Sequence, residues 1–122
     1  MVNVKAPQAI QAFARVLQND ANALTILQNS LARDVRIVAL DNGTKTATST
    51  PAKVVSLITR MVLPNAGGAL DVTKTGNGTW KIEAYISRPH EGCIITADCT
   101  LRDDKIVEIF LESTRGTYVF IL

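Results

Sequence analysis

Residues 79–87 read TWKIEAYIS, a stretch in which apolar and polar side chains alternate without interruption. Its apolar members are Trp80, Ile82, Ala84 and Ile86. Successive side chains of a β-strand point to opposite faces of the sheet, so this spacing predicts a strand with one buried face and one face in water. A sheet with one wet face is typical of antiparallel pairing.

The same pattern extends along the C-terminal half of the chain. It predicts three further strands, at residues 69–75, 93–101 and 105–112. Turn residues separate the strands, at 76–78, 88–92 and 102–104. In the last strand, the predicted apolar face comprises Val107, Ile109 and Leu111. This half is therefore expected to form an antiparallel meander.

The N-terminal part has a helical period instead. Four apolar residues after Pro7 recur at the spacing i, i+3, i+4 and i+7: Ile10, Phe13, Ala14 and Leu17. Asn19 and Asp20 interrupt this pattern and suit the cap of a second helix. That helix is expected to continue through Leu31 and to end at Asp34.

A hairpin and a third helix are predicted between these two halves. The period changes to two over residues 35–40, and Asp41–Gly43 has the chemistry of a tight turn. The polar residues 44–50 then form a short strand or a loop. Thr50 and Pro51 begin a helix, because proline is favoured in the first helical turn. Its apolar face comprises Val54, Leu57, Ile58, Met61 and Val62.

Helices gathered at the start of the chain beside a meander predict an α+β fold. We expect the three N-terminal helices to pack in the concave face of a bent, mainly antiparallel sheet. A chain of 122 residues supplies one core, so residues 1–122 are expected to form a single domain.

Charge and hydropathy exclude several classes of function. Thirteen Lys and Arg residues against eleven Asp and Glu residues give a net charge of +2, which predicts no nucleic-acid partner and no membrane-surface partner. No apolar run approaches the roughly 20 residues of a membrane span. The first residues lack a basic and then apolar leader, so we expect a cytoplasmic protein.

The cysteines and the single histidine predict no metal site. Cys93 and Cys99 lie on one face of a predicted strand, about 20 Å apart along it. A disulfide needs Cα atoms within about 7 Å, so both thiols are expected to be free and buried. His90 lies alone in a loop, and no cluster has the spacing of a zinc site. No glycine-rich phosphate loop follows a strand, and no cofactor is expected.

Three short segments carry a resemblance to a known superfamily. They are LARDVRIV at residues 31–38, TPAKVV at 50–55 and LRDDKIVEI at 101–109. Their order and spacing resemble the nuclear transport factor 2-like superfamily, which includes the SnoaL-like and ketosteroid isomerase families. Two positions depart from the family pattern, because Asp104 stands where glycine is usual and no glycine precedes the third helix.

The resemblance implies a cystatin-like α+β cone: a strongly bent mixed sheet wrapped over three helices. It also implies a pocket at the wide end and a dimer formed through the outer face of the sheet. In ketosteroid isomerases, a carboxylate base works in an apolar cavity together with a tyrosine and a protonated aspartate. The matching positions fall near Ala39, Ala12 and Ala97, and a methyl group cannot move a proton. This argues against isomerase chemistry of that type.

Other ionisable residues are weaker catalytic candidates. If this alignment with the family is wrong by one or two residues, Asp41 or Asp98 would stand at a catalytic position. The alternation sends Asp98 outward, and Asp41 lies in a turn. An unusual arrangement could instead use Asp41, His90 or Asp71.

The predicted inner face is almost entirely apolar and is the expected ligand-binding surface. We expect it to hold a hydrophobic small molecule between Phe13, Leu17, Ile37, Met61, Trp80, Ile82, Ile95, Cys99 and Ile109. A filled core is the alternative for the same residues. The outer face is mixed and suits either solvent or a homodimer interface, through Lys81, Glu83, Tyr85, Thr96 and Asp98.

Three functions therefore stay open from the sequence. The first is a binding protein for an apolar small molecule, with little or no catalysis. The second is a small isomerase, cyclase or hydrolase of the SnoaL-like or ketosteroid isomerase-like type. The third is a homodimeric interaction module that uses the outer face of the sheet.

Overall fold

The computed structural model describes residues 6–62, 69–88 and 91–116. Three helices are formed: α1 (Gln8–Leu17), α2 (Ala23–Asn29) and α3 (Pro51–Val62). Six strands are formed: β1 (Leu31–Asp41), β2 (Thr44–Ser49), β3 (Ala69–Gly76), β4 (Thr79–Arg88), β5 (Glu91–Arg102) and β6 (Lys105–Gly116). No helix in these ranges is long and apolar enough to cross a membrane.

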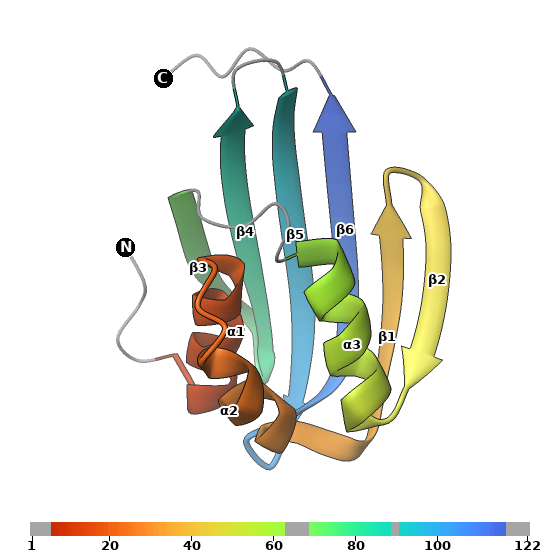
Figure 1. Ribbon diagram of the computed structural model, residues 1–122. Helices are drawn as coiled ribbons and strands as arrows, with labels where there is room; N and C mark the ends of the chain where they lie inside the picture. Colours follow the sequence, from red (N-terminus) through yellow and green to blue (C-terminus); the bar gives the residue numbers. More distant parts are fainter. Residues whose placement is uncertain (1–5, 63–68, 89–90, 117–122) are drawn as a thin grey trace.

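The six strands form one mixed sheet in the order β2-β1-β6-β5-β4-β3. Every neighbouring pair is antiparallel except β1 and β6, which are parallel. The sheet is curved and does not close, and all three helices lie on its concave face (Figure 1). The predicted α+β architecture is thus confirmed.

Helix α2 is shorter than the sequence predicts. It ends at Asn29 and not at Asp34, and the hydroxyl of Ser30 donates a hydrogen bond of 2.7 Å to the carbonyl of Ile26 in its last turn. Leu31 is already part of β1, where it pairs with Ile106 of β6. Leu31 is buried in β1, and its apolar side chain fits the helical period of the sequence as well as the strand.

The predicted tight turns are present. Asn42 and Gly43 have φ angles of 51° and 94°, which is the two-residue turn that joins β1 to β2. Gly78 has a φ of 78° in the turn between β3 and β4. The turn between β5 and β6 uses Asp103 and Asp104, at φ angles of 52° and 64°.

Strand β6 contains a bulge that corrects the predicted apolar face. Glu108 pairs with Thr100 of β5, while the next pair along β5 joins Leu101 to Ile106. Val107 is therefore the extra residue, and a bulge of this kind reverses the alternation on one side of it. Ile106 is consequently fully buried in place of Val107, which is only partly buried.

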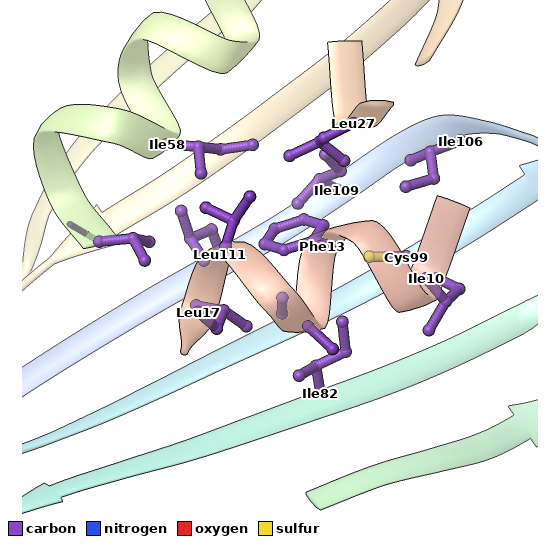
Figure 2. Packing of buried hydrophobic residues seen from close by; sticks show 14 of the residues in the cluster. Ile10, Phe13, Leu17, Leu27, Ile58, Ile82, Cys99, Ile106, Ile109 and Leu111 are labelled. Carbon is purple, nitrogen blue, oxygen red and sulfur yellow. The ribbon is translucent and has the colours of Figure 1, made fainter. Parts of the chain in front are cut away.

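The core lies between the helices and the concave face of the sheet (Figure 2). Helix α1 contributes Phe13, which is fully buried among side chains from the strands and the other helices. Burial of apolar surface at about 25 cal/mol per Å² is what holds the two layers together.

The residue before α3 has an unusual backbone conformation. Thr50 has a φ of 72°, in the left-handed region that β-branched residues rarely adopt. Its amide donates to the carbonyl of Val35 at 3.3 Å, and its carbonyl accepts from the amide of Val54 at 3.0 Å. Thr50 thus joins the start of α3 to β1 at the position where the superfamily pattern has glycine.

Candidate functional site

The nine predicted ligand-binding residues come together in one buried cluster. Their exposed fractions run from 0% for Phe13 and Leu17 to 6% for Met61 and Trp80. Side chains with so little accessible surface contact one another rather than water. The part of the concave face that the helices cover is therefore a packed core (Figure 2).

Three alanines stand at the positions that the resemblance matches to the catalytic residues of ketosteroid isomerases, and all three belong to the same core. Ala39 and Ala97 are fully buried in the sheet, and Ala12 is 2% exposed in α1. No ionisable side chain replaces them there. Among the described residues, the one buried polar side chain is Ser113.

Polar groups gather on the concave face where β1 and β6 end. The guanidinium nitrogen Nη2 of Arg115 donates a hydrogen bond of 2.9 Å to Oδ1 of Asp41. Both side chains keep about 40% of their surface in solvent, at 37% for Arg115 and 41% for Asp41. Asp41 is two residues beyond the buried Ala39, so it lies at the rim of the concave face and not beneath the sheet.

Three neighbouring residues complete this group, which we call the rim cluster: Asp41, Asn42, Cys93, Ser113 and Arg115. Asn42 extends the pairing of β1 with β6, because its amide donates to the carbonyl of Ser113 at 2.7 Å and its side chain accepts from the amide of Arg115 at 3.2 Å. The Ser113 hydroxyl lies 3.5 Å from the sulfur of Cys93. The cluster thus combines an ion pair at the rim with a buried hydroxyl and thiol beside it.

The strand registers show how the rim cluster meets the apolar face. Asp41 and Ser113 are opposite each other, and the same row continues through Ile95 and Ala84 of β5 and β4. The next row towards the helices is entirely apolar, from Ala39 to Val72. One corner of the concave face is therefore polar, and the surface beside it is apolar.

The other catalytic candidates do not join this cluster. Asp98 is exposed on the outer face, as the alternation predicts. Asp71 is exposed on β3, opposite Glu83 of β4. His90 lies outside the described residues.

Sequence reasoning missed Arg115 and Ser113, although a signal for both was present. The alternation of Ile109 and Leu111 continues through Ser113 to Arg115 on the same face. The predicted strand ends at Glu112, before both residues. The strand in fact runs to Gly116.

The outer face carries the polar residues expected there. The Tyr85 hydroxyl donates to Oε2 of Glu83 at 2.6 Å, and this hydrogen bond raises the pKa of Tyr85. The amine of Lys81 lies 4.0 Å from Oε1 of Glu83. Phe110 is 40% exposed on the same face, an apolar residue that the sequence analysis did not single out.

Both cysteines are free and buried, as predicted. Burial raises the pKa of the Cys99 thiol, and the nearby charge of Asp98 adds to this effect. Within the described ranges, no group of three His, Cys, Asp or Glu residues is placed to hold a metal ion.

Comparison with known proteins identifies the fold. By sequence, the chain matches no family model and no curated protein. By structure, it is similar to an NTF-2-like protein of unknown function from Burkholderia xenovorans LB400, with a TM-score of 0.63, 11% identity, and coverage of 91% of this chain and 84% of that one. It is also similar to a de novo designed protein with a curved β-sheet, with a TM-score of 0.63, 17% identity, and coverage of 85% and 80%.

An enzyme has the same architecture. An LEH-like epoxide hydrolase from M. tuberculosis is similar with a TM-score of 0.52 and 16% identity, over 86% of this chain and 79% of that one. At these identities the similarity concerns the fold alone. The bent sheet, its strand order and the three helices on its concave face give this chain the fold of the nuclear transport factor 2-like superfamily.

Proposed function

We propose that the protein binds a small molecule with an apolar body and one polar end at the rim of the concave face. The rim cluster supports this proposal, because it puts one partly exposed ion pair at the edge of the otherwise apolar concave face. Strands β4, β5 and β6 extend past the described ends of the helices on this side (Figure 1). The polar end of the ligand would lie on Asp41 and Arg115.

The chemistry of the ion pair limits the polar end. The Asp41 carboxylate accepts hydrogen bonds and the Arg115 guanidinium donates them. Because the two charges already neutralise each other, a ligand gains most when it offers one donor and one acceptor and no net charge. A hydroxyl or a carbonyl on a flat apolar body meets this requirement, as in steroids, aromatic polyketides and naphthols.

A thermal-shift experiment tests the proposal. Progesterone, 2-naphthol and an anthraquinone polyketide are added separately, and the unfolding midpoint is measured. A ligand at 100 times its dissociation constant stabilises by about 2.7 kcal/mol. Because 1 kcal/mol shifts the midpoint of a domain of this size by about 4 °C, the expected rise is about 10 °C.

Two variants make this experiment specific to the rim. Arg115→Met removes the donor and should abolish most of the rise. Arg33→Met is the matched control, since Arg33 is an exposed arginine on β1, outside the rim cluster and outside the proposed dimer interface. The proposal fails if none of the three compounds raises the midpoint, or if the two variants respond alike.

A second candidate is an isomerase, and the contact between Asp41 and Arg115 favours it. In such a reaction, Asp41 would take a proton from a carbon beside a carbonyl group, while Arg115 donates a hydrogen bond to the carbonyl oxygen as it becomes negative. Returning the same proton to another carbon completes the isomerisation without a co-reactant. The test is conversion of 5-androstene-3,17-dione, which Asp41→Asn should reduce at least 100-fold. Wild-type turnover no faster than buffer excludes this candidate.

A homodimer through the outer face is the proposed assembly. The exposed Phe110 and Tyr85 support it, together with a surface hollow of about 490 Å³ lined by Val38, Asp98 and Phe110 among others. Light scattering at high concentration should give twice the mass of the chain, and Phe110→Lys should return it to the monomer value. A monomeric wild type excludes the dimer.

A further inference from the structure

A cavity is lined in part by the turns that join β3 to β4 and β5 to β6. Figure 1 shows both turns at the end of the sheet opposite the end of β6. The cavity has a volume of about 360 Å³. We call it the Trp80 cavity, and its lining residues are Pro7, Lys74, Gly78, Trp80, Leu101, Asp103 and Asp104. Neither the proposed function nor the packed core uses these groups together.

Trp80, which lines this cavity, has an indole N–H without a hydrogen-bond partner among the described residues. Trp80 is only 6% exposed, and its N–H donates to no group among the described residues. In the described part of the chain, every fully buried side-chain nitrogen or oxygen atom has a hydrogen-bond partner. Because the indole nitrogen of Trp80 has none, it is not fully buried and keeps some accessible surface. The small surface that Trp80 keeps lines the cavity, and a buried indole normally finds a partner for its N–H.

Charged groups of both signs surround the same cavity. Lys74 is directly opposite Trp80 in the pairing of β3 with β4, so a cationic donor lies beside the indole. Asp103 and Asp104 supply two carboxylates from the turn between β5 and β6. None of these three charges takes part in an ion pair found among the described residues. The cavity therefore offers donors on one side and acceptors on the other.

We propose that the Trp80 cavity binds a free α-amino acid with an aliphatic side chain. Its carboxylate would accept hydrogen bonds from the indole N–H of Trp80 and from the amine of Lys74. Its ammonium group would donate to Asp103 and Asp104. The aliphatic side chain would lie against Leu101 and Pro7, the apolar part of the lining.

Simpler ligands use only half of the site. An amine without a carboxylate leaves Trp80 and Lys74 without acceptors. An anion without an ammonium group meets the two carboxylates of Asp103 and Asp104, and like charges repel. A zwitterion satisfies both sides at once: its carboxylate gives the buried indole of Trp80 an acceptor, and its ammonium group lies beside the exposed carboxylates of Asp103 and Asp104.

Trp80 itself reports on binding, because it is the only tryptophan of the chain. L-leucine is titrated into the full chain while the indole emission is recorded. The expected result is a saturable change with a dissociation constant of about 1 mM or below. Isoamylamine, which lacks the carboxylate, and 4-methylpentanoate, which lacks the ammonium group, should each bind at least 10-fold more weakly.

A pair of double variants tests the carboxylates without disturbing the turn. Asp103→Asn with Asp104→Asn removes two charges, and asparagine tolerates the positive φ of both positions. This variant should bind L-leucine at least 10-fold more weakly. The control is Asp71→Asn with Glu112→Gln, which removes two charges from positions outside the cavity and should leave binding unchanged.

Three outcomes overturn the proposal. The first is an indole emission that shows no saturable change with L-leucine. The second is binding of isoamylamine as tight as that of L-leucine, which identifies a simple cation site. The third is equal affinity of the two double variants. Because the rim cluster lies at the other end of the sheet, none of these outcomes depends on the thermal-shift experiment.

Discussion

Asp41 of β1 and Arg115 of β6 are 74 residues apart along the chain, and their side chains meet at 2.9 Å. The contact follows from the parallel pairing of these two strands, which brings both strand ends to the same corner of the sheet. It is the point at which the concave face changes from apolar to polar.

This ion pair should contribute little to stability. Each partner keeps about 40% of its side chain in solvent, and exposed pairs are worth about 0.2–1 kcal/mol. A double-mutant cycle with Asp41→Asn and Arg115→Met, followed by urea unfolding, should give a coupling energy in that range. A coupling above about 2 kcal/mol would mean that the pair is needed for folding rather than available for a ligand.

Glycine at position 50 should stabilise the protein. A non-glycine residue in the left-handed region costs about 1–2 kcal/mol, and Thr50 has a φ of 72°. Thr50→Gly should therefore raise the free energy of unfolding by about 1 kcal/mol, after the entropy that glycine adds to the unfolded chain. Thr48→Gly is the matched control within β2 and should lower it. A lower free energy of unfolding in Thr50→Gly would show that the backbone of Thr50 is not strained.

Replacing Phe13 by alanine should lower the free energy of unfolding far more than replacing Phe110 by alanine. Phe13 is fully buried, so Phe13→Ala should cost about 3–5 kcal/mol. Phe110 is 40% exposed, and Phe110→Ala should change the stability of the monomer by no more than about 0.5 kcal/mol. Urea unfolding at a low protein concentration measures both. Similar costs at the two positions would mean that the core is assigned wrongly.

The cysteines should resist alkylation in the folded protein. Cys93 and Cys99 are buried, and the raised pKa of Cys99 leaves little of the reactive thiolate at pH 8. Iodoacetamide should label neither thiol of the native chain, and both in concentrated urea, as counted by mass spectrometry. Rapid labelling of Cys99 under native conditions would contradict its burial.

Asp34 should titrate at a lower pH in the folded chain than in the unfolded chain. The Arg102 side chain donates a hydrogen bond of 2.8 Å to it, which lowers the pKa of Asp34. A depressed pKa gives a stabilisation that is present above the unfolded pKa and is lost as the pH falls through the folded value. Because both side chains of the pair are largely exposed, the stability change is small, and NMR titration of the carboxyl carbon is the better measurement. Arg102→Met should raise the pKa of Asp34 back towards its ordinary value, because the hydrogen bond from Arg102 is the largest cause of the shift.

Local patterns predicted most of the fold because each one has a direct physical cause. The alternation around Trp80 and Ile82 requires a half-buried strand, and Asn42–Gly43 suits a two-residue turn. The end of α2 was wrong because Leu31 satisfies both the helical and the strand pattern. Val107 was placed inside because a bulge shifts the alternation by one residue, and its position depends on pairing with β5.

The site was harder to predict than the fold for the same reason. The contact of Asp41 with Arg115 depends on the parallel pairing of β1 with β6, which no local pattern indicates. The nine apolar residues were correctly grouped, since burial follows from hydropathy. That they form a packed core beneath the helices depends on the exact curvature of the sheet, which no short stretch of sequence determines.

The parallel pairing of β1 with β6 also has a consequence for biosynthesis. Strand β6 lies between β1 and the strands β5, β4 and β3. The sheet therefore cannot be completed until β6, which ends at Gly116, has left the ribosome. Contacts of such long sequence separation slow folding. Until β6 is made, the three helices can pack on one another and on β1 and β2, so the core of this fold should close only after β6 has joined β1 to β5.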